Sequence, residues 1–299
     1  MSRYLLILPI GLIAQLVDGT LGMGYGASSS SMLIAAGFLP AMVSASVHAA
    51  EILSSFSSGV SHFKLGNVDK KIVLPLTGGG VVGGVIGACL LSNIDGKLFK
   101  PYIGLLLMII GIKILFTFLK KKTGIEVNKH IPRRFLLPLG LIGGAIDAIG
   151  GGGWGPICTS TLISAKNVDP RKTVGSVNAS EFLVTLAITI TFAIALGLET
   201  FLWRITLPLM IGGVIAAPLS AYTCKKISPG NLGVGIGLLL IILNLHAVAL
   251  ALSNVLGVSL PAKFDLVVVL TAVTVGLTMV IKSLPFRIVV VRKESRQEA

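Results

Sequence analysis

Two short glycine-rich segments carry the residue types that could do chemistry in this chain. The first runs from 18 to 31 and the second from 147 to 161, and both are flanked by apolar sequence. Each contains an aspartate, then spaced glycines, one aromatic residue and a run of hydroxyl side chains. Glycine permits positive φ and close backbone approach, so each segment predicts a break between two short helices. The free N–H groups and positive dipole end of the second helix would then favour an anion.

The candidate anion site combines these backbone N–H groups with nearby hydroxyl, amide and imidazole donors. We expect substrate contacts from Gly22, Gly24, Gly26, Ser28, Ser29, His48, Gly151, Gly153, Trp154, Cys158, Thr159, Ser160 and Asn178. Few basic residues lie deep in the apolar stretches, which favours a small oxyanion that is bound by neutral donors and released again. The alternative is that the glycines only allow close helix crossing. Two matched runs of glycines and hydroxyls exceed what packing alone requires.

The two segments occupy equivalent positions in an internal repeat. An offset of 129 residues maps Asp18 to Asp147, Gly22 to Gly151 and Tyr25 to Trp154, and the offset drifts to 130 and then 133 further along the chain. Two copies of a broken helix are typical of transporters that bind substrate where the copies meet.

Four acidic residues inside apolar sequence are further candidates. Glu51 aligns with Glu181, and a carboxylate within a membrane is functional by default. The two could carry protons coupled to anion movement, or accept hydrogen bonds from the broken helices. Asp18 and Asp147 are expected to end the first helices as caps or hinge acceptors.

Three other candidate contacts have structural alternatives. His48 and its match Asn178 could contact the anion or serve as polar packing. Cys158 could contact a sulfur compound, although a small filler is the simpler interpretation.

Composition places the chain in the membrane. Its 299 residues are 54% hydrophobic and only 12% charged, whereas soluble domains carry about 25% charged residues. Several apolar stretches approach the ~20 residues that span a bilayer. We therefore expect an all-α integral membrane protein rather than a soluble enzyme. The net charge is +13, and the charged residues cluster in short connections between the apolar stretches. Nucleic acid is therefore not an expected partner. The three cysteines form no CxxC pair, and no metal or cofactor is expected.

The expected organisation is two repeats, a linker and a C-terminal extension. Each repeat contains a broken or re-entrant helix pair followed by three transmembrane helices. The expected parts are repeat 1 at 1–119 (arms 4–17 and 27–39; spans near 42–62, 72–92 and 101–119), a basic linker at 120–134, repeat 2 at 135–253 (arms 135–149 and 156–165; spans near 173–197, 203–224 and 231–253), and an extension at 254–299 with one extra span at 264–284 and a basic tail.

Charge distribution predicts that the repeats have inverted topology. If each broken pair returns to its starting side, 19 basic residues lie on one face and 5 on the other; if each pair crosses once, the split is 12 against 12. Positive charge accumulates on the cytoplasmic side, which favours inversion, with the linker and C-terminus in the cytoplasm of a multi-pass cell-membrane protein. The count does not separate a re-entrant pair from two full crossings. A homodimer is possible.

The chain resembles the TauE/SafE family of transporters, which export sulfite and related organosulfur anions. The strongest local match is Gly150-Gly-Gly-Gly153-Trp-Gly-Pro156, whereas Gly22-Met-Gly24-Tyr-Gly26 lacks the glycine run and the proline. The resemblance implies anion transport. Together with the matched broken helices and the inverted charge pattern, it leads us to expect an exporter of a small oxyanion, sulfite or a related sulfur-containing anion, that works by alternating access. An anion channel and a carrier of small carboxylates are the alternatives. An intramembrane enzyme is disfavoured because neither a Gly-x-Gly aspartate motif nor a His-Glu-x-x-His motif is present.

Overall fold

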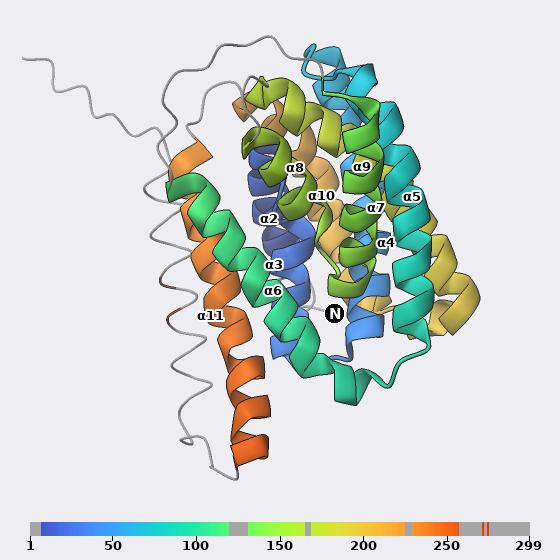
Figure 1. The fold of residues 1–299 in the computed structure, drawn as a ribbon, viewed down its shortest axis with the longest axis vertical. Helices are drawn as coiled ribbons and strands as arrows, with labels where there is room; N and C mark the ends of the chain where they lie inside the picture. Colours follow the sequence, from blue (N-terminus) through green and yellow to red (C-terminus); the bar gives the residue numbers. More distant parts are fainter. Residues whose placement is uncertain are drawn as a thin grey trace, which may run out of the picture.

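A computed structural model describes residues 7–119, 131–164, 169–224 and 229–256, together with Thr271 and Thr274. The expected extra span at 264–284, the C-terminal tail and most of the basic linker lie outside the described residues. The described helices are α2 (Ile7–Leu21), α3 (Tyr25–Ala35), α4 (Pro40–Lys64), α5 (Lys70–Ser92), α6 (Gly96–Leu119), α7 (Arg133–Gly150), α8 (Trp154–Ser164), α9 (Pro170–Leu196), the short 3₁₀ helix η1 (Leu198–Thr200), α10 (Trp203–Thr223) and α11 (Pro229–Leu256) (Figure 1).

The outer surface of the helical bundle is strongly apolar. Four of the described helices are long and apolar enough to cross a membrane: 70–92, 98–119, 170–196 and 203–223. On α10, large exposed side chains recur every fourth residue at Leu207, Ile211, Ile215 and Leu219. This i, i+4 spacing places them on one helix face. A continuous exposed apolar face of this kind is what lipid contact requires.

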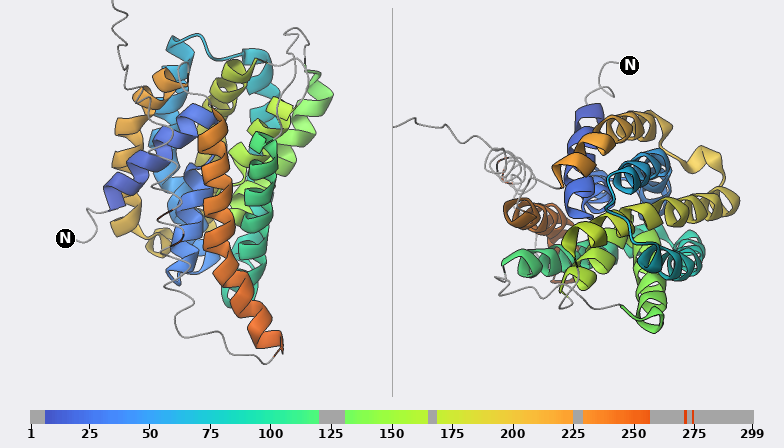
Figure 2. Two further views of the ribbon diagram at one scale, coloured as in Figure 1. Left: turned by 90° about the vertical axis from the view of Figure 1, so that its left-hand side faces the viewer. Right: turned by 90° about the horizontal axis from the view of Figure 1, so that it is seen from above.

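The helices pack mainly across the two halves of the chain. Helix α2 lies against α10, α5 lies against α7, α4 crosses α9, and α6 lies beside α11. The end-on view in Figure 2 shows the α6–α11 pair, in green and orange, set apart from the α5–α7 pair. The halves therefore do not form separate bodies in the described part of the chain, and each first arm (α2 or α7) lies against a long helix of the other half.

Glycines bring two of these pairs into backbone contact. A methyl group built at Gly144 would lie 2.9 Å from the backbone nitrogen of Gly84, and one built at Gly83 would collide with the carbonyl of Leu141. The α2–α10 pair is equally tight, because a methyl group at Gly212 would lie 2.7 Å from the nitrogen of Leu12. Small residues allow this close approach in membrane helices, where packing rather than water expulsion drives association.

Both helix breaks occur where the glycines predict them, but the bounds of the arms differ from expectation. Helices α2 and α7 continue to Leu21 and Gly150, so Asp18 and Asp147 lie in the last helical turn instead of ending it. The reason is that their carbonyls still accept the i+4 hydrogen bonds, from Gly22 at 2.5 Å and from Gly151 at 2.7 Å.

The second arms also begin earlier than predicted. Helices α3 and α8 start at Tyr25 and Trp154, two residues before the expected starts in each case. Helix α7 begins at Arg133, so the end of the predicted linker is already helical. Helix α3 ends at Ala35 because Gly37 takes a φ of 100°, and the helix does not reach the predicted end at 39.

Candidate functional site

The interruption between α2 and α3 and the one between α7 and α8 have related backbone conformations. Gly22 has a φ of 71° and Gly151 a φ of 69°, both in the left-handed region. Gly24 follows with a φ of 129° and caps the start of α3. A residue with a Cβ atom would be strained at these φ values. This explains why the matched positions 22 and 151, where the first arms end, are both glycine.

The two interruptions lie in direct contact at the centre of the bundle. A methyl group built at Gly26 would lie 2.7 Å from the Cα atom of Gly152, and one built at Gly155 would lie 2.6 Å from the Cα atom of Met23. Each loop therefore touches the first turn of the opposite second arm. All of these residues are buried, so the two helix starts meet each other directly in this conformation rather than facing an open space.

A reciprocal pair of hydrogen bonds joins the loops. The Thr159 hydroxyl donates to the carbonyl of Gly22 at 2.6 Å. The Ser30 hydroxyl donates to the carbonyl of Gly151. Ser30 maps to Thr159 and Gly22 maps to Gly151 by the same offset of 129 residues, so the two bonds are equivalent contacts of the two halves.

Aspartate side chains accept hydrogen bonds from the first N–H groups of both second arms. Asp147 Oδ1 accepts from the backbone nitrogens of Gly153 at 2.6 Å and Trp154 at 2.9 Å. Asp18 Oδ1 accepts from the nitrogen of Tyr25 at 3.4 Å. A carboxylate is the favoured group at a helix N-terminus because of the unpaired donors and the dipole. The donors expected to hold a substrate anion are thus held here by carboxylates of the chain.

Glu51 adds a second carboxylate to the start of α3. It lies on α4, is 3% exposed, and interacts with the backbone N–H of Gly26. Its Oε2 atom is buried without a hydrogen-bond partner. A buried acceptor with a free lone pair is costly, so this oxygen marks a place where a proton or a donor could bind.

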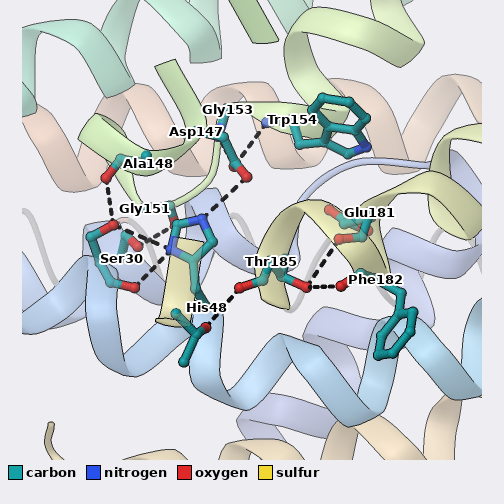
Figure 3. A network of polar contacts seen from close by, with 12 residues as sticks. Ser30, His48, Asp147, Ala148, Gly151, Gly153, Trp154, Glu181, Phe182 and Thr185 are labelled. Atoms are coloured by element: carbon teal, nitrogen blue, oxygen red, sulfur yellow. Dashed lines mark hydrogen bonds and ion pairs between the residues drawn. The ribbon is translucent and has the colours of Figure 1, made fainter. Parts of the chain in front are cut away.

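The matched polar residues His48 and Asn178 have different surroundings. His48 Nε2 lies 3.1 Å from Asp147 Oδ2, and the Nδ1 atom lies 2.7 Å from the carbonyl oxygen of Ser44. Figure 3 shows the His48 ring directed at Asp147, beside the loop of Gly151 and Gly153. Asn178 instead donates to the Val174 carbonyl at 3.1 Å, and its Oδ1 atom has no partner.

Four carboxyl groups from four helices gather around the two interruptions. Asp18, Glu51, Asp147 and Glu181 all lie within electrostatic range of one another. His48 and Asp147 form an ion-pair contact within this cluster, with 3.1 Å between His48 Nε2 and Asp147 Oδ2. Lys113, half-buried on α6, donates to the Thr161 hydroxyl on α8 at 3.1 Å.

Several of the predicted substrate contacts form hydrogen bonds within the protein itself. Ser28 and Ser160 donate to carbonyls one turn back, those of Gly24 and Pro156. Trp154 is fully buried, and its indole N–H donates to the Val177 carbonyl at 3.2 Å.

Two other predicted contacts have no such bond to their own helix. Ser29 is buried with an unpaired hydroxyl. Cys158 points toward α7, where a methyl group built at Gly143 would lie 2.6 Å from its sulfur.

Two serines with direct contacts to the interruptions were absent from the predicted set. Ser30 contacts the Gly151 loop, and Ser44 donates to the Ala148 carbonyl at 2.6 Å, two residues before the end of α7. The offset of the internal repeat maps Ser30 to Thr159, which is a predicted contact, and this match could have identified Ser30 from the sequence. Nothing in the sequence distinguishes Ser44 from the other serines of α4.

An apolar helical bundle that encloses two interrupted helices and a buried polar cluster defines an integral membrane protein. The chain belongs to the sulfite exporter TauE/SafE family, whose model matches residues 7–247. It is 46% identical over 236 residues to the probable membrane transporter protein YtnM of Bacillus subtilis (strain 168), covering 78% of this chain and 79% of that protein.

A second relative is more distant. A probable membrane transporter protein of Haemophilus influenzae (strain ATCC 51907 / DSM 11121 / KW20 / Rd) is 25% identical over 216 residues, which cover 71% of this chain and 81% of that protein. No solved structure gives a significant match. The chain is thus a membrane transporter of the TauE/SafE family.

Proposed function

We propose that this transporter exports a small oxyanion, sulfite or a related sulfur-containing anion, across the cell membrane. The family description supports the substrate class. The observation that carries the proposal is the contact between the two helix interruptions, at Gly26 with Gly152 and at Gly155 with Met23. It brings two helix N-termini from opposite halves to one point, and such N-termini favour negative charge without a buried Lys or Arg.

The anion takes the place of the chain's own carboxylates at these N-termini. Asp147 and Glu51 accept hydrogen bonds from backbone N–H groups that a substrate oxygen would use. A carboxylate and an oxyanion in one buried site repel each other, because the low dielectric of the interior strengthens the interaction. Binding therefore requires a proton on a neighbouring carboxyl group, and Glu51 and Glu181 are the proposed acceptors.

We further propose that the two halves are inverted repeats and that transport proceeds by alternating access. The packing supports this relationship: α2 with α10 is the equivalent of α7 with α5, and α3 with α11 is the equivalent of α8 with α6. Inverted repeats place the substrate at their interface, where rocking of one half against the other exposes it alternately. In the proposed orientation the C-terminus is cytoplasmic, because the basic connections gather on that side.

The test is flux through purified protein reconstituted in liposomes. We expect saturable sulfite efflux down a gradient, and competition by thiosulfate if related sulfur anions share the site. Failure of sulfite, thiosulfate, sulfonates and small carboxylates to move would remove the proposal. Transport of small carboxylates alone would keep the carrier and reject the sulfur anion. Unsaturable flux with single-channel current would identify an anion channel.

A further inference from the structure

The two nitrogens of the His48 ring lie beside two hydrogen-bond acceptors, the Ser44 carbonyl oxygen and the Asp147 carboxyl group. Its Nδ1 atom lies 2.7 Å from the Ser44 carbonyl oxygen, which can only accept, so Nδ1 carries a hydrogen. Its Nε2 atom lies 3.1 Å from Asp147 Oδ2. A neutral ring would then present a lone pair to the carboxylate. Asp147 Oδ1 already accepts two backbone N–H groups, so the geometry points to a shared hydrogen on His48 Nε2, directed at Asp147 Oδ2.

The other buried histidine shows the contrasting arrangement. His62 Nε2 lies 3.0 Å from the Gly19 carbonyl oxygen, and its Nδ1 atom lies 3.2 Å from the side-chain amide nitrogen of Asn67. One ring nitrogen of His62 meets an acceptor and the other meets a donor, so a neutral imidazole satisfies both. Only His48 of these two fully buried rings has acceptors on both sides.

The surroundings of the pair make this proton important for an anion. His48 is 0% exposed and Asp147 is 2% exposed. The titratable groups in electrostatic range of Asp147 are acidic or neutral and come from the helices around it: Asp18 on α2, Glu51 on α4, Cys158 on α8 and Glu181 on α9. Lys113 on α6 interacts electrostatically with Cys158 and donates a hydrogen bond to the Thr161 hydroxyl on α8.

The equivalent position in the other half cannot hold this proton. Asn178 is the match of His48, and its amide does not titrate. Its nitrogen bonds to Val174 in its own helix, and its oxygen has no partner. Of these two matched positions, only His48 can therefore hold this proton, beside the N-terminus of α8.

We propose that His48 and Asp147 form a proton-binding site that couples proton movement to anion movement in this carrier. With its proton the pair has no net charge, and without it the pair has one negative charge beside the α8 N-terminus. An anion at that N-terminus is repelled by the deprotonated pair and accepted by the protonated one. One proton therefore accompanies each anion through this pair, and loss of the proton on one side of the membrane promotes release of the anion there. This inference rests on the proposed anion transport.

The protonation state is tested without any substrate. The chain has four histidines, and ¹⁵N labelling of the imidazole nitrogens reports whether each carries a hydrogen. The signal that disappears in His48→Asn identifies His48, and we expect both of its nitrogens to be protonated at neutral pH. The signal lost in His62→Gln should belong to a neutral ring. A neutral His48 in the wild-type protein would overturn the proposal.

Coupling is tested by measuring protons and sulfite together in liposomes that contain a pH dye. His48→Asn copies the natural residue at the matched position, and we expect the proton-to-sulfite ratio to fall by one relative to the wild type, with weaker sulfite binding. The comparison at one pH cancels the titration of sulfite itself. His62→Gln is the control for loss of a buried histidine and should keep the wild-type ratio. An unchanged ratio in His48→Asn, with sulfite still transported, overturns the inference and leaves the proposed function standing.

A second variant keeps the proposal testable if His48→Asn does not fold. Asp147→Asn removes the carboxylate that holds the proton, so the His48 ring should become neutral and the ratio should fall by the same amount. A doubly protonated His48 ring in Asp147→Asn would contradict the proposed proton-binding pair. Absence of anion flux in the wild type would reject the proposed function, whereas the ¹⁵N result would still decide the protonation of His48.

Discussion

Thr159 donates its hydroxyl hydrogen to the Gly22 carbonyl at 2.6 Å, across 137 residues of sequence. Ser30 makes the equivalent bond to Gly151. Together these bonds tie the second arm of each half to the interruption of the other half. Neither loop has its conformation set by its own half alone, and this mutual dependence suits a site that must respond to both halves at once.

Thr159→Val tests this connection. Valine keeps the shape of threonine and removes the donor, which leaves a buried carbonyl without its partner at a cost of about 1–3 kcal/mol. We expect a lower thermal unfolding midpoint in detergent and slower anion flux. Thr191→Val is the matched control, because the Thr191 hydroxyl bonds only to Ala187 in its own helix. Equal effects of the two changes would contradict a special role for the cross-half bond.

Gly152→Ala tests the contact between the interruptions. A methyl group there would collide with the backbone nitrogen of Ala27, which cannot move aside as a flexible side chain can. We expect loss of transport and a marked loss of thermal stability. Gly78→Ala is the control, since a methyl group at that helical glycine would lie 3.8 Å from the side chain of Leu137. Alanine in a helix interior is favoured over glycine by about 1 kcal/mol, so the control should be as stable as the wild type or more so.

The two cap aspartates should differ in importance. Asp147 accepts from the backbone of Gly153 and Trp154 and lies 3.1 Å from His48 Nε2, whereas Asp18 accepts from Tyr25 at a longer distance of 3.4 Å. Breaking a buried charge pair costs about 3–5 kcal/mol, so Asp147→Asn should lower the unfolding midpoint much more than Asp18→Asn. Thermal melts of the two purified variants under identical detergent conditions provide the measurement. The reverse order would mean that the shorter bonds do not determine stability.

Glu51→Gln tests the carboxyl group beside the α3 N-terminus. Glutamine keeps an oxygen to accept from the Gly26 N–H and removes the ability to bind a proton. We expect uptake driven by a pH gradient to weaken, because one proton-binding group is removed, while exchange of anion for anion continues. Glu181→Gln is the matched change in the other half. Unchanged pH-driven uptake in both variants would exclude these carboxyl groups as proton carriers.

Side-specific labelling tests the inverted arrangement. Asn93 and Glu199 are exposed at connections that should face outward, whereas Lys70 and Lys172 are exposed at connections that should face the cytoplasm. In a cysteine-free background, an impermeant maleimide should label Asn93→Cys and Glu199→Cys in intact cells. Lys70→Cys and Lys172→Cys should be labelled only after permeabilisation. Labelling of Asn93→Cys and Glu199→Cys from opposite sides would indicate parallel halves.

The helix interruptions could be predicted from the sequence because their cause is local. Gly22 and Gly151 need left-handed backbone, and each second arm starts two residues from its predicted start. The matched offset also placed the aspartates, the aromatic residues and Glu51 with Glu181 in equivalent positions. These features depend on residue type and spacing, which a single chain displays directly.

The partners of the hydroxyl groups could not be predicted in the same way. Whether Ser29 or Ser30 faces the other half depends on the rotation of α3 about its axis, which packing against α4 and α11 determines. Cys158 lies near the candidate site in sequence, yet it packs on Gly143 because α8 turns that face toward α7. The capping of both N-termini by carboxylates likewise depends on how far α2 and α7 extend past the aspartates.

The glycine contacts between α5 and α7 and between α2 and α10 have a mechanical consequence. Where Gly83 faces Leu141 and Gly212 faces Leu12, the backbones of the two helices touch without a side chain between them. Interlocked side chains resist sliding, whereas smooth surfaces permit shear at low cost. We therefore expect each first arm to slide along the long helix of the opposite half during transport, and such a displacement would separate the two helix starts and admit a solute between them.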